Sequence, residues 1–397
     1  MRSFFTKRKI LIILGVILSV IFILVLAAYL YIHSIISKIN IVAPNMEEDP
    51  GSAENSGSVS AFADPGQEGD ASRGNSNDEV PGYNTAQPGE GSGDGTTDAE
   101  EAINPSDPLD PQIAALEEKI RKNMEENQIP VLSDNNVFNV LLIGSDSRES
   151  GGSGRSDAMI LVSVNKKTKK IIVTSILRDI YVGIPGKEEN NRINTAYAYG
   201  RSKLLLQTVE QNFKIHVEEY ASIDFFAFID MVDAVGGITL DVTEAEIPVI
   251  NDYISEINKL TGQAKTKDHL KEPGTLLLSG KQTLGYVRNR YVGNSDFERT
   301  ARQRRVLEQV FEKVKKLNLL ELQNLMNLIL PQITTNLTEK EIFSLILSLP
   351  SYMNYDIDQW SIPKSGTYES VRIRGMAVLG IDFGANINAL RERVYGK

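Results

Sequence analysis

The hydrophobic and polar positions divide the chain into an apolar run, a polar stretch and a long patterned segment. Residues 10–32 form a run of 23 residues without a charged side chain. As a helix, this run is long enough to cross a bilayer core of roughly 30 Å. Because four basic residues lie within residues 1–9, we predict a single transmembrane helix with a cytoplasmic N-terminus and the rest of the chain outside the cell. A cleaved signal peptide is the alternative, but its apolar region is typically about 7–15 residues long.

The stretch after this run offers little to bury. Residues 45–111 are rich in Gly, Ser, Asp, Glu and Pro. With almost no bulky apolar groups, such a segment cannot offset its ordering entropy by burial. We therefore predict that residues 33–111 form an acidic, flexible extracytoplasmic linker. The apolar spacing that follows predicts a short helical stalk, residues 112–136.

From Val137 onward, buried strands alternate with amphipathic helices. Strands are predicted at VFNVLLIG, AMILVSVN, KIIVTSIL and EEYASI, with NKKTKK as a polar hairpin turn. Helices are predicted at residues 195–213, 225–235, 279–290, 298–316, 339–347 and 387–395. This alternation predicts an α/β layered domain with a mostly buried sheet across residues 137–397.

Charge and composition narrow the possible chemistry. The net charge of −10 is misleading, because residues 45–111 hold 16 acidic residues against one basic residue, Arg73, and the remainder is net +5. The chain has no cysteine, which excludes disulfides, thiolate metal sites and cysteine nucleophiles. The three histidines lack metal-ligand spacing. Neither a P-loop nor a G-x-S-x-G nucleophile motif is present.

Two polar loops lie at predicted strand ends. The loop in GSDSRESGGSGRSDAM places Asp146 and Asp157 at adjacent strand ends, where two carboxylates can share a hard cation such as Mg²⁺. In SILRDI, Arg178 and Asp179 directly follow a strand, at the edge where open α/β sheets bind ligands. Ordinary turn aspartates and a strand-end salt bridge are the alternatives.

Six arginines crowd the segment YVRNRYVGNSDFERTARQRR. Arg288 and Arg290 end one predicted helix, and Arg299, Arg302 and Gln303 share one face of the next. Converging guanidiniums suit phosphate, because their planar forks pair with it bidentately. We expect the last two arginines, 304 and 305, to face outward. A surface salt-bridge network is the alternative, and nucleic-acid binding is disfavoured because this segment is predicted to lie outside the cell.

These features, together with LLIGSDSR, NRINTAYAYG, FIDMVDAVGGITLDV, LSGKQTLGYVRNRY and the ending LGIDFGANINALRERVYG, resemble the LytR-CpsA-Psr family of cell-wall enzymes. The resemblance implies a single α/β/α domain with a central mixed sheet, preceded by one transmembrane helix. It also implies a Mg²⁺-dependent or Mn²⁺-dependent phosphotransferase. Such an enzyme moves an anionic glycopolymer, such as Gram-positive wall teichoic acid or capsule, from an undecaprenyl-pyrophosphate carrier to peptidoglycan.

The resemblance also implies roles for individual residues. The implied metal ligands are Asp146 and Asp157, and the implied catalytic residues are Asp146, Asp157, Arg178 and Asp296. The implied pyrophosphate contacts are Arg148, Arg178, Arg288, Arg290, Arg299 and Gln303. Two other functions stay open, a pyrophosphatase that uses water as the acceptor and a non-catalytic wall-binding or regulatory protein. No nucleic-acid partner is expected.

Overall fold

The computed structural model describes residues 30–42, 111–125, 129–145, 155–293 and 295–396. The predicted transmembrane helix, residues 10–32, lies outside these ranges except for its last three positions. Within the described ranges, no helix is long and apolar enough to cross a membrane.

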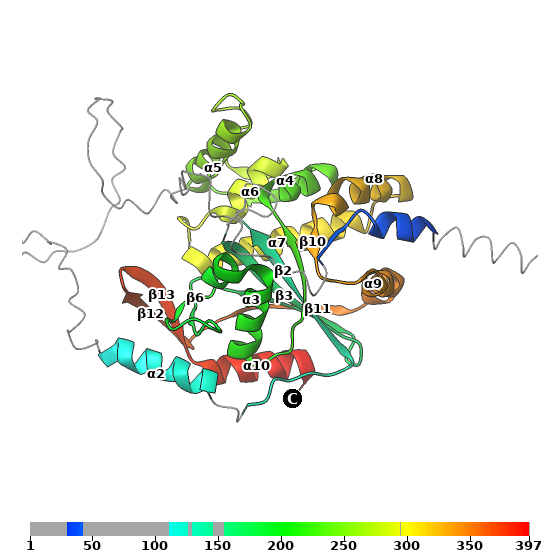
Figure 1. Cartoon of the computed structure of the whole chain (residues 1–397). Coiled ribbons are helices and arrows are strands. Elements are labelled where there is room, and N and C mark those ends of the chain that lie inside the picture. Colours follow the sequence, from blue (N-terminus) through cyan, green and yellow to red (C-terminus); the bar gives the residue numbers. More distant parts are fainter. Residues whose placement is uncertain (1–29, 43–110, 126–128, 146–154, 294, 397) are drawn as a thin grey trace, which may run out of the picture. The chain divides into compact units, whose positions relative to one another are not determined.

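A seven-stranded mixed sheet lies at the centre of the fold, in the order β1-β10-β7-β2-β3-β4-β11 (Figure 1). Its strands are β1 (Asn40–Ile41), β2 (Val137–Ser145), β3 (Ser156–Asn165), β4 (Lys170–Ile176), β7 (Glu219–Ile223), β10 (Thr334–Thr335) and β11 (Asp356–Ile362). β2, β3 and β4 pair antiparallel, whereas β7 and β11 pair parallel with β2 and β4. The predicted α/β class with a central mixed sheet is confirmed.

One hydrophobic cluster covers the face of the sheet formed by residues such as Leu141, Leu161 and Ile172. It is completed by α2 (Pro111–Glu125), α3 (Thr195–Phe213), α10 (Phe383–Tyr395) and the hairpin of β12 (Tyr368–Ile373) and β13 (Met376–Ile381). The short strands β5 (Tyr181–Val182) and β6 (Asn191–Arg192) pair with each other beside it. Odd-numbered residues of β2 are buried there from Asn139 onward, because side chains alternate between faces along a strand.

A second cluster joins the helices that follow β7. It contains α4 (Phe225–Ala234), α5 (Glu246–Leu260), α6 (Gly280–Arg288), α7 (Ser295–Val314), α8 (Leu319–Ile329) and the hairpin of β8 (Ile238–Val242) and β9 (Gly274–Leu278). Glycine sets the position of α6. A Cβ at Gly280 would lie 2.2 Å from the carbonyl oxygen of Ile229, and one at Gly285 would lie 2.9 Å from that of Ile250. These two positions therefore allow α6 to pack closely against α4 and α5.

The predicted helices at residues 195–213, 225–235, 279–290, 298–316, 339–347 and 387–395 are confirmed, with α9 (Glu339–Tyr352) longer than expected. The polar turn between β3 and β4 is also confirmed. There the Asn165 side chain accepts hydrogen bonds from the backbone N–H groups of Lys167 and Thr168, both at 2.9 Å. Helix α5 and strands β8 and β9 had no sequence prediction.

The predicted linker boundary at residue 33 is wrong, because residues 30–42 are folded. Residues 30–36 are helical, and β1 pairs parallel with β10. Ile36 is 2% exposed and packs with Leu337 and Ile342. The isoleucines of this segment supply the apolar surface that is buried in this contact. Residues 43–110 therefore connect β1 to α2, two elements of the same folded unit.

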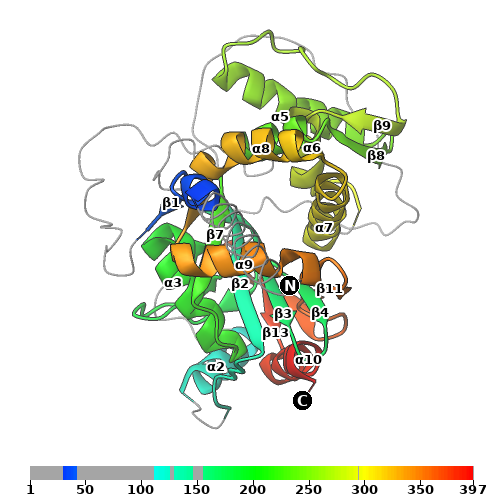
Figure 2. The same ribbon diagram turned by 90° about the vertical axis from the view of Figure 1, so that its right-hand side faces the viewer.

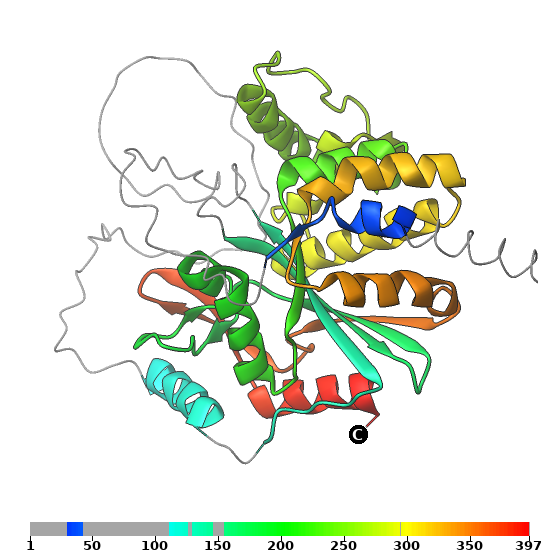
Figure 3. The ribbon, with the colours of Figure 1, turned by 45° about the vertical axis from the view of Figure 1, so that its right-hand side comes forward.

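The prediction that residues 112–136 form a stalk is also wrong, because the helix in this range packs against the domain. Helix α2 exists, but its apolar stripe is buried, with Leu116 and Ile120 each 1% exposed. The Asn123 side-chain amide donates to the carbonyl oxygen of Asn212 at 3.1 Å. The helix therefore lies against α3 and forms part of the domain (Figure 3). The spacing of apolar residues is the same in an isolated amphipathic helix and in one that packs against a domain, so the sequence does not distinguish the two.

Replacing Leu116 tests this packing. The Leu116→Ala variant should lose about 2–5 kcal/mol of unfolding free energy, because the side chain fills space against Gly380 of β13. Lys119→Ala, on the exposed side of α2, should change it by less than about 1 kcal/mol, since its ion pair with Glu369 is at the surface. Chemical denaturation measures both. Equal, small losses would mean that α2 does not contribute to the core.

Candidate functional site

Two strand ends bring the first pair of site residues together. Ile160 of β3 pairs with Ser175 of β4, and the antiparallel register continued by three residues places Asp157 opposite Arg178. Arg178 Nη1 donates a hydrogen bond of 2.6 Å to Asp157 Oδ1. Both side chains are mostly buried, so the ion pair sits in a setting where charges interact strongly.

The start of α7 brings two more residues to this pair. Arg178 Nε lies 4.0 Å from Asp296 Oδ1, and Arg299 Nη2 lies 2.9 Å from the same oxygen. Asp157, Arg178 and the start of α7 therefore lie close together, as the family resemblance implied. The catalytic and pyrophosphate-binding roles of these residues remain predictions.

Arg288, the last residue of α6, is held on three sides. Its Nη1 pairs with Glu256 Oε2 at 3.1 Å, and its Cζ lies 4.5 Å from the Phe225 ring centroid and 4.4 Å from that of Tyr253. Stacking between two aromatic faces orients a guanidinium and is energetically favourable. Sequence reasoning missed Tyr253 and Glu256, because α5 lies some thirty residues before the arginine segment.

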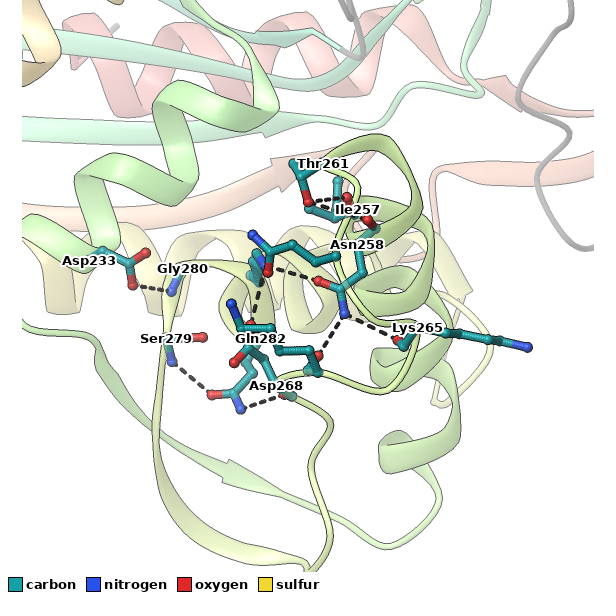
Figure 4. Close-up of polar contacts among 12 residues, drawn as sticks. Asp233, Ile257, Asn258, Thr261, Lys265, Asp268, Ser279, Gly280 and Gln282 are labelled. Atoms are coloured by element: carbon teal, nitrogen blue, oxygen red, sulfur yellow. Dashed lines mark hydrogen bonds and ion pairs between the residues drawn. The ribbon is translucent and has the colours of Figure 1, made fainter.

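The helices that present Arg288 are locked together by polar contacts (Figure 4). Asn258 of α5 is fully buried, and its side-chain amide donates to the carbonyl oxygens of Lys265 and Lys267 at 3.1 and 2.7 Å. Gln282 of α6 accepts from the Ser279 N–H and donates to the carbonyl oxygen of Asp268. These hydrogen bonds connect the loop between α5 and α6 to both helices, and Arg288 is the last residue of α6.

Asp157 is the carboxylate on which the arginines converge. Burial alone would raise its pKa, but the charges of Arg178, Arg299 and Arg288 outweigh burial and lower the pKa. Asp157 is therefore ionised at neutral pH. The positive charges of all three guanidiniums therefore stabilise this carboxylate in its ionised form.

Asp179 behaves in the opposite way. Its Oδ1 lies 3.3 Å from Arg192 Nε and 3.7 Å from Arg178 Nε. Burial, with the neighbouring charge of Asp296, raises the pKa of Asp179 despite these arginines. Sequence reasoning missed Arg192, whose one signal was its position in the motif NRINTAYAYG. Its guanidinium also donates to the carbonyl oxygen of Ala377 at 2.7 Å.

Two arginines of α7 are equally buried but differently satisfied. Arg302 is 3% exposed and donates to Glu246 Oε1 and to the carbonyl oxygens of Asn289 and Val292, at 2.9–3.0 Å. The prediction that it shares the ligand-facing side with Arg299 is wrong, because it caps the carbonyls of the loop before α7. It is a structural residue.

Arg299, also 3% exposed, is short of acceptors. Its Nε and Nη2 are buried without a hydrogen bond to any described residue, although Nη2 is within ion-pair distance of Asp296. Burial lowers its pKa. Buried donors in folded proteins are almost always paired, and one oxyanion could accept from both nitrogens. Arg299 is therefore the clearest mark of an anion site.

The remaining predicted residues are placed less tightly. Arg290 lies beyond the end of α6, with its Cζ 5.9 Å from the Tyr291 ring centroid, and Gln303 is half-buried one turn after Arg299. Their pyrophosphate roles stay predictions. Asp146 and Arg148 lie outside the described residues. In the described part of the chain, no group of three or more histidine or acidic side chains is arranged to hold a metal.

The last two arginines of the segment differ from each other. Arg305 is exposed, pairs with Glu298 and donates to the Tyr286 hydroxyl, so its predicted outward orientation is confirmed. The same prediction for Arg304 is wrong. Its guanidinium donates to Ser175 Oγ at 2.8 Å, so this side chain turns toward β4 and is half-buried.

The chain is similar to one family model and to several known proteins. The model of the LytR_cpsA_psr family matches residues 109–385, a range that begins just before α2. Biofilm regulatory protein A of Streptococcus mutans is 36% identical over 200 residues, 47% of this chain and 47% of that protein. The polyisoprenyl-teichoic acid–peptidoglycan teichoic acid transferase TagU of Enterococcus faecalis is 36% identical over 190 residues, 47% of this chain and 57% of that protein.

These alignments span about half the length of the two curated relatives. Among solved structures, TagT bound to LI-WTA is similar, with a TM-score of 0.52 and 28% identity over 67% of this chain and 92% of that chain.

Paired substitutions on α7 test the difference between its two buried arginines. Arg302→Met should lower the unfolding free energy by about 3–5 kcal/mol, because Glu246 and two carbonyl groups lose their donor. Arg299→Met should cost less than about 1 kcal/mol, because it removes a buried charge whose donors lack acceptors. Thermal and chemical denaturation measure both. Equal losses would mean that Arg299 is also structural.

Proposed function

This chain belongs to the LytR-CpsA-Psr family, and on that basis we propose that it is a membrane-anchored extracytoplasmic phosphotransferase. It moves an anionic glycopolymer from an undecaprenyl-pyrophosphate carrier to peptidoglycan. The observation that carries the proposal is Arg299, whose buried donors lack acceptors beside Arg178 and Asp157. The name of TagU, a teichoic acid transferase, and the TagT structure with LI-WTA support this substrate class.

The donor's pyrophosphate is the group that matches the site. Arg178 and Arg299 both approach Asp296 Oδ1, the charge of Arg288 also acts on Asp157, and the planar forks of all three suit phosphate oxygens. Arg288 is oriented by its two aromatic neighbours, so little rotamer freedom is lost when it binds. In this proposal, Arg299 supplies the two buried donors and Arg178 turns part of its hydrogen bonding from Asp157 to the ligand.

Transfer follows from this placement of charge. A peptidoglycan hydroxyl attacks the phosphorus that bears the glycopolymer, a new P–O bond forms, and the bond to the bridging oxygen of the pyrophosphate breaks. The products are a phosphodiester and the polyprenyl phosphate. Negative charge grows on the leaving phosphate, and fixed guanidiniums stabilise it more strongly than water does.

The hydroxyl proton needs an acceptor, and the carboxylates Asp179 and Asp296 are the candidates. A general base works best when its pKa lies near the working pH. Burial and the charge of Asp296 raise the pKa of Asp179, which shifts this carboxylate toward the working pH. We assign it the role of proton acceptor, with Asp296 tuning it.

A divalent cation, Mg²⁺ or Mn²⁺, fits part of this donor set. Asp157 is ionised and offers hard oxygen atoms, and Asp146 would be its second ligand on the neighbouring strand end. When bound, the ion would neutralise charge on the pyrophosphate. No step above depends on it, because the arginines, Asp179 and the substrate account for the charges and the proton.

The polyprenyl tail requires an apolar surface. On the face of β2 opposite the main cluster, Val140 and Leu142 are only partly buried. Phe225, Phe228 and Met231 of α4 are also partly buried against the second cluster. These side chains support an apolar slot beside the arginines. A pyrophosphatase is the second candidate function, because the same site with water as the acceptor would release the polymer without transferring it.

Donor binding and product analysis test the proposal. Arg299→Met should weaken binding of a short-chain polyprenyl pyrophosphate by about 1.5–3 kcal/mol, roughly 10- to 150-fold. Lys at this position should restore binding only in part, because it lacks the fork. Arg305→Ala is the control and should change affinity several-fold at most. Equal losses in the Met and Ala variants would mean a diffuse basic surface.

The same preparations distinguish the two candidate functions. Labelled polymer supplied on a lipid pyrophosphate should become attached to peptidoglycan oligomers. Its release as free phosphorylated polymer, with peptidoglycan unlabelled, would instead establish a pyrophosphatase.

The pH dependence tests the proton acceptor. Transfer should fall as pH is lowered through the raised pKa of Asp179, because the protonated carboxyl cannot accept a proton. The free energy of unfolding should instead decrease as pH rises. A raised carboxyl pKa means that the folded state is stabilised by protonation, so this contribution fades as pH rises through the folded pKa. Asp179→Asn should abolish transfer yet remove this pH-dependent loss of stability. A variant with normal transfer would exclude the role.

A further inference from the structure

The helix of residues 30–36 fixes the point at which the chain enters the folded domain. Ile36 is buried against Leu337 and Ile342 at the start of α9. Lys38 Nζ donates to Asn327 Oδ1 of α8 at 2.5 Å. The chain then continues into β1, which pairs with β10. The helix is therefore attached to α8, α9 and the sheet within a few residues.

Exposed apolar side chains gather on these same elements. Figure 2 shows α8, the helix of residues 30–36 and α9 on one face. Leu320 of α8 is 66% exposed and Leu347 of α9 is 62% exposed. The other exposed large apolar residues on these three helices or at their ends are Leu30, Tyr31, Leu328, Leu349 and Met353. These seven are more than half of the thirteen in the described part of the chain, and such a concentration marks an interaction surface.

The sequence before this helix identifies the partner. Residues 10–29 contain no charged side chain and lead directly into Leu30. If they cross a bilayer, as the proposed membrane anchoring requires, the bilayer surface lies at the N-terminal end of the helix. Seven helical residues span roughly 10 Å. Helices α8 and α9, which contact residues 36 and 38, are then held close to that surface.

We propose that the exposed leucines of α8 and α9 dock onto the membrane surface and hold the catalytic domain in a fixed orientation there. The inference rests on the proposed anchoring and adds a second contact to it. Apolar side chains gain by leaving water for the interfacial region of a bilayer. A single span would leave the domain free to tilt, whereas a span and an apolar face together define its orientation toward a lipid-linked substrate.

The absence of cysteine from the chain makes the test direct. Full-length protein in bilayers carries one spin label at a time, through Leu320→Cys, Leu347→Cys, Leu277→Cys or Leu24→Cys. Leu277 is the matched control, because it is 64% exposed but lies on β9, in the hairpin with β8. Relaxation by oxygen, which concentrates in lipid, is compared with relaxation by a water-soluble nickel complex.

Labels at 320 and 347 should show an oxygen-to-nickel ratio several-fold higher than the label at 277. A ratio at 320 and 347 equal to that at 277, with a lipid signal at 24, would overturn the docking proposal and leave the anchor intact. A water signal at 24 would overturn the anchor and the docking together. Protection from both reagents with spin–spin broadening would mean that a second copy, and not the bilayer, covers the face.

Discussion

Positive charge in the protein interior is the constraint on which this structure depends. A guanidinium removed from water must find acceptors, and the two most buried arginines of α7 differ in how far the fold supplies them. Arg302 has a carboxylate and two carbonyl oxygens, whereas Arg299 has an ion pair and two buried donors without a hydrogen bond to any described residue. Such an imbalance costs stability. In the proposed function this cost is removed when the donor's pyrophosphate binds, so stability given up in folding contributes to recognition.

The strands and helices around Arg299 fix the positions of the other charged side chains of this site. The register of β3 and β4 sets Asp157 against Arg178, and this carboxylate limits the repulsion among three guanidiniums. The glycines of α6 allow close packing on α4 and α5, which places Phe225 and Tyr253 on either side of Arg288. Burial, together with the like charge of Asp296, raises the pKa of Asp179. One small region thus holds a low-pKa and a high-pKa carboxylate, a separation that permits distinct roles.

Sequence reasoning reached the parts of the site that depend on local pattern. Strand ends predicted the meeting of residues 157 and 178, and the helix after the arginine-rich loop predicted Arg299. It failed where a contact depended on distant packing. Helical spacing predicted that Arg302 lies beside Arg299. In the structure its guanidinium instead donates hydrogen bonds to Glu246 and to two carbonyl groups of a neighbouring loop. Tyr253 and Glu256 carry no local signal. The roles of Asp146, Arg148, Arg290 and Gln303 stay predictions.

Burial likewise decided the two boundaries that the pattern placed wrongly. An amphipathic helix of fifteen residues has the same stripe whether it stands alone or packs, and α2 packs. A strand of two residues, β1, is too short to carry a pattern. Because β1 pairs with β10, the segment of residues 43–110 begins and ends on one folded unit. It therefore does not lead from the predicted membrane helix to the domain. If the proposed membrane anchor exists, the length of residues 43–110 therefore does not set its distance from the domain, which depends on the short path from Leu30 to β1.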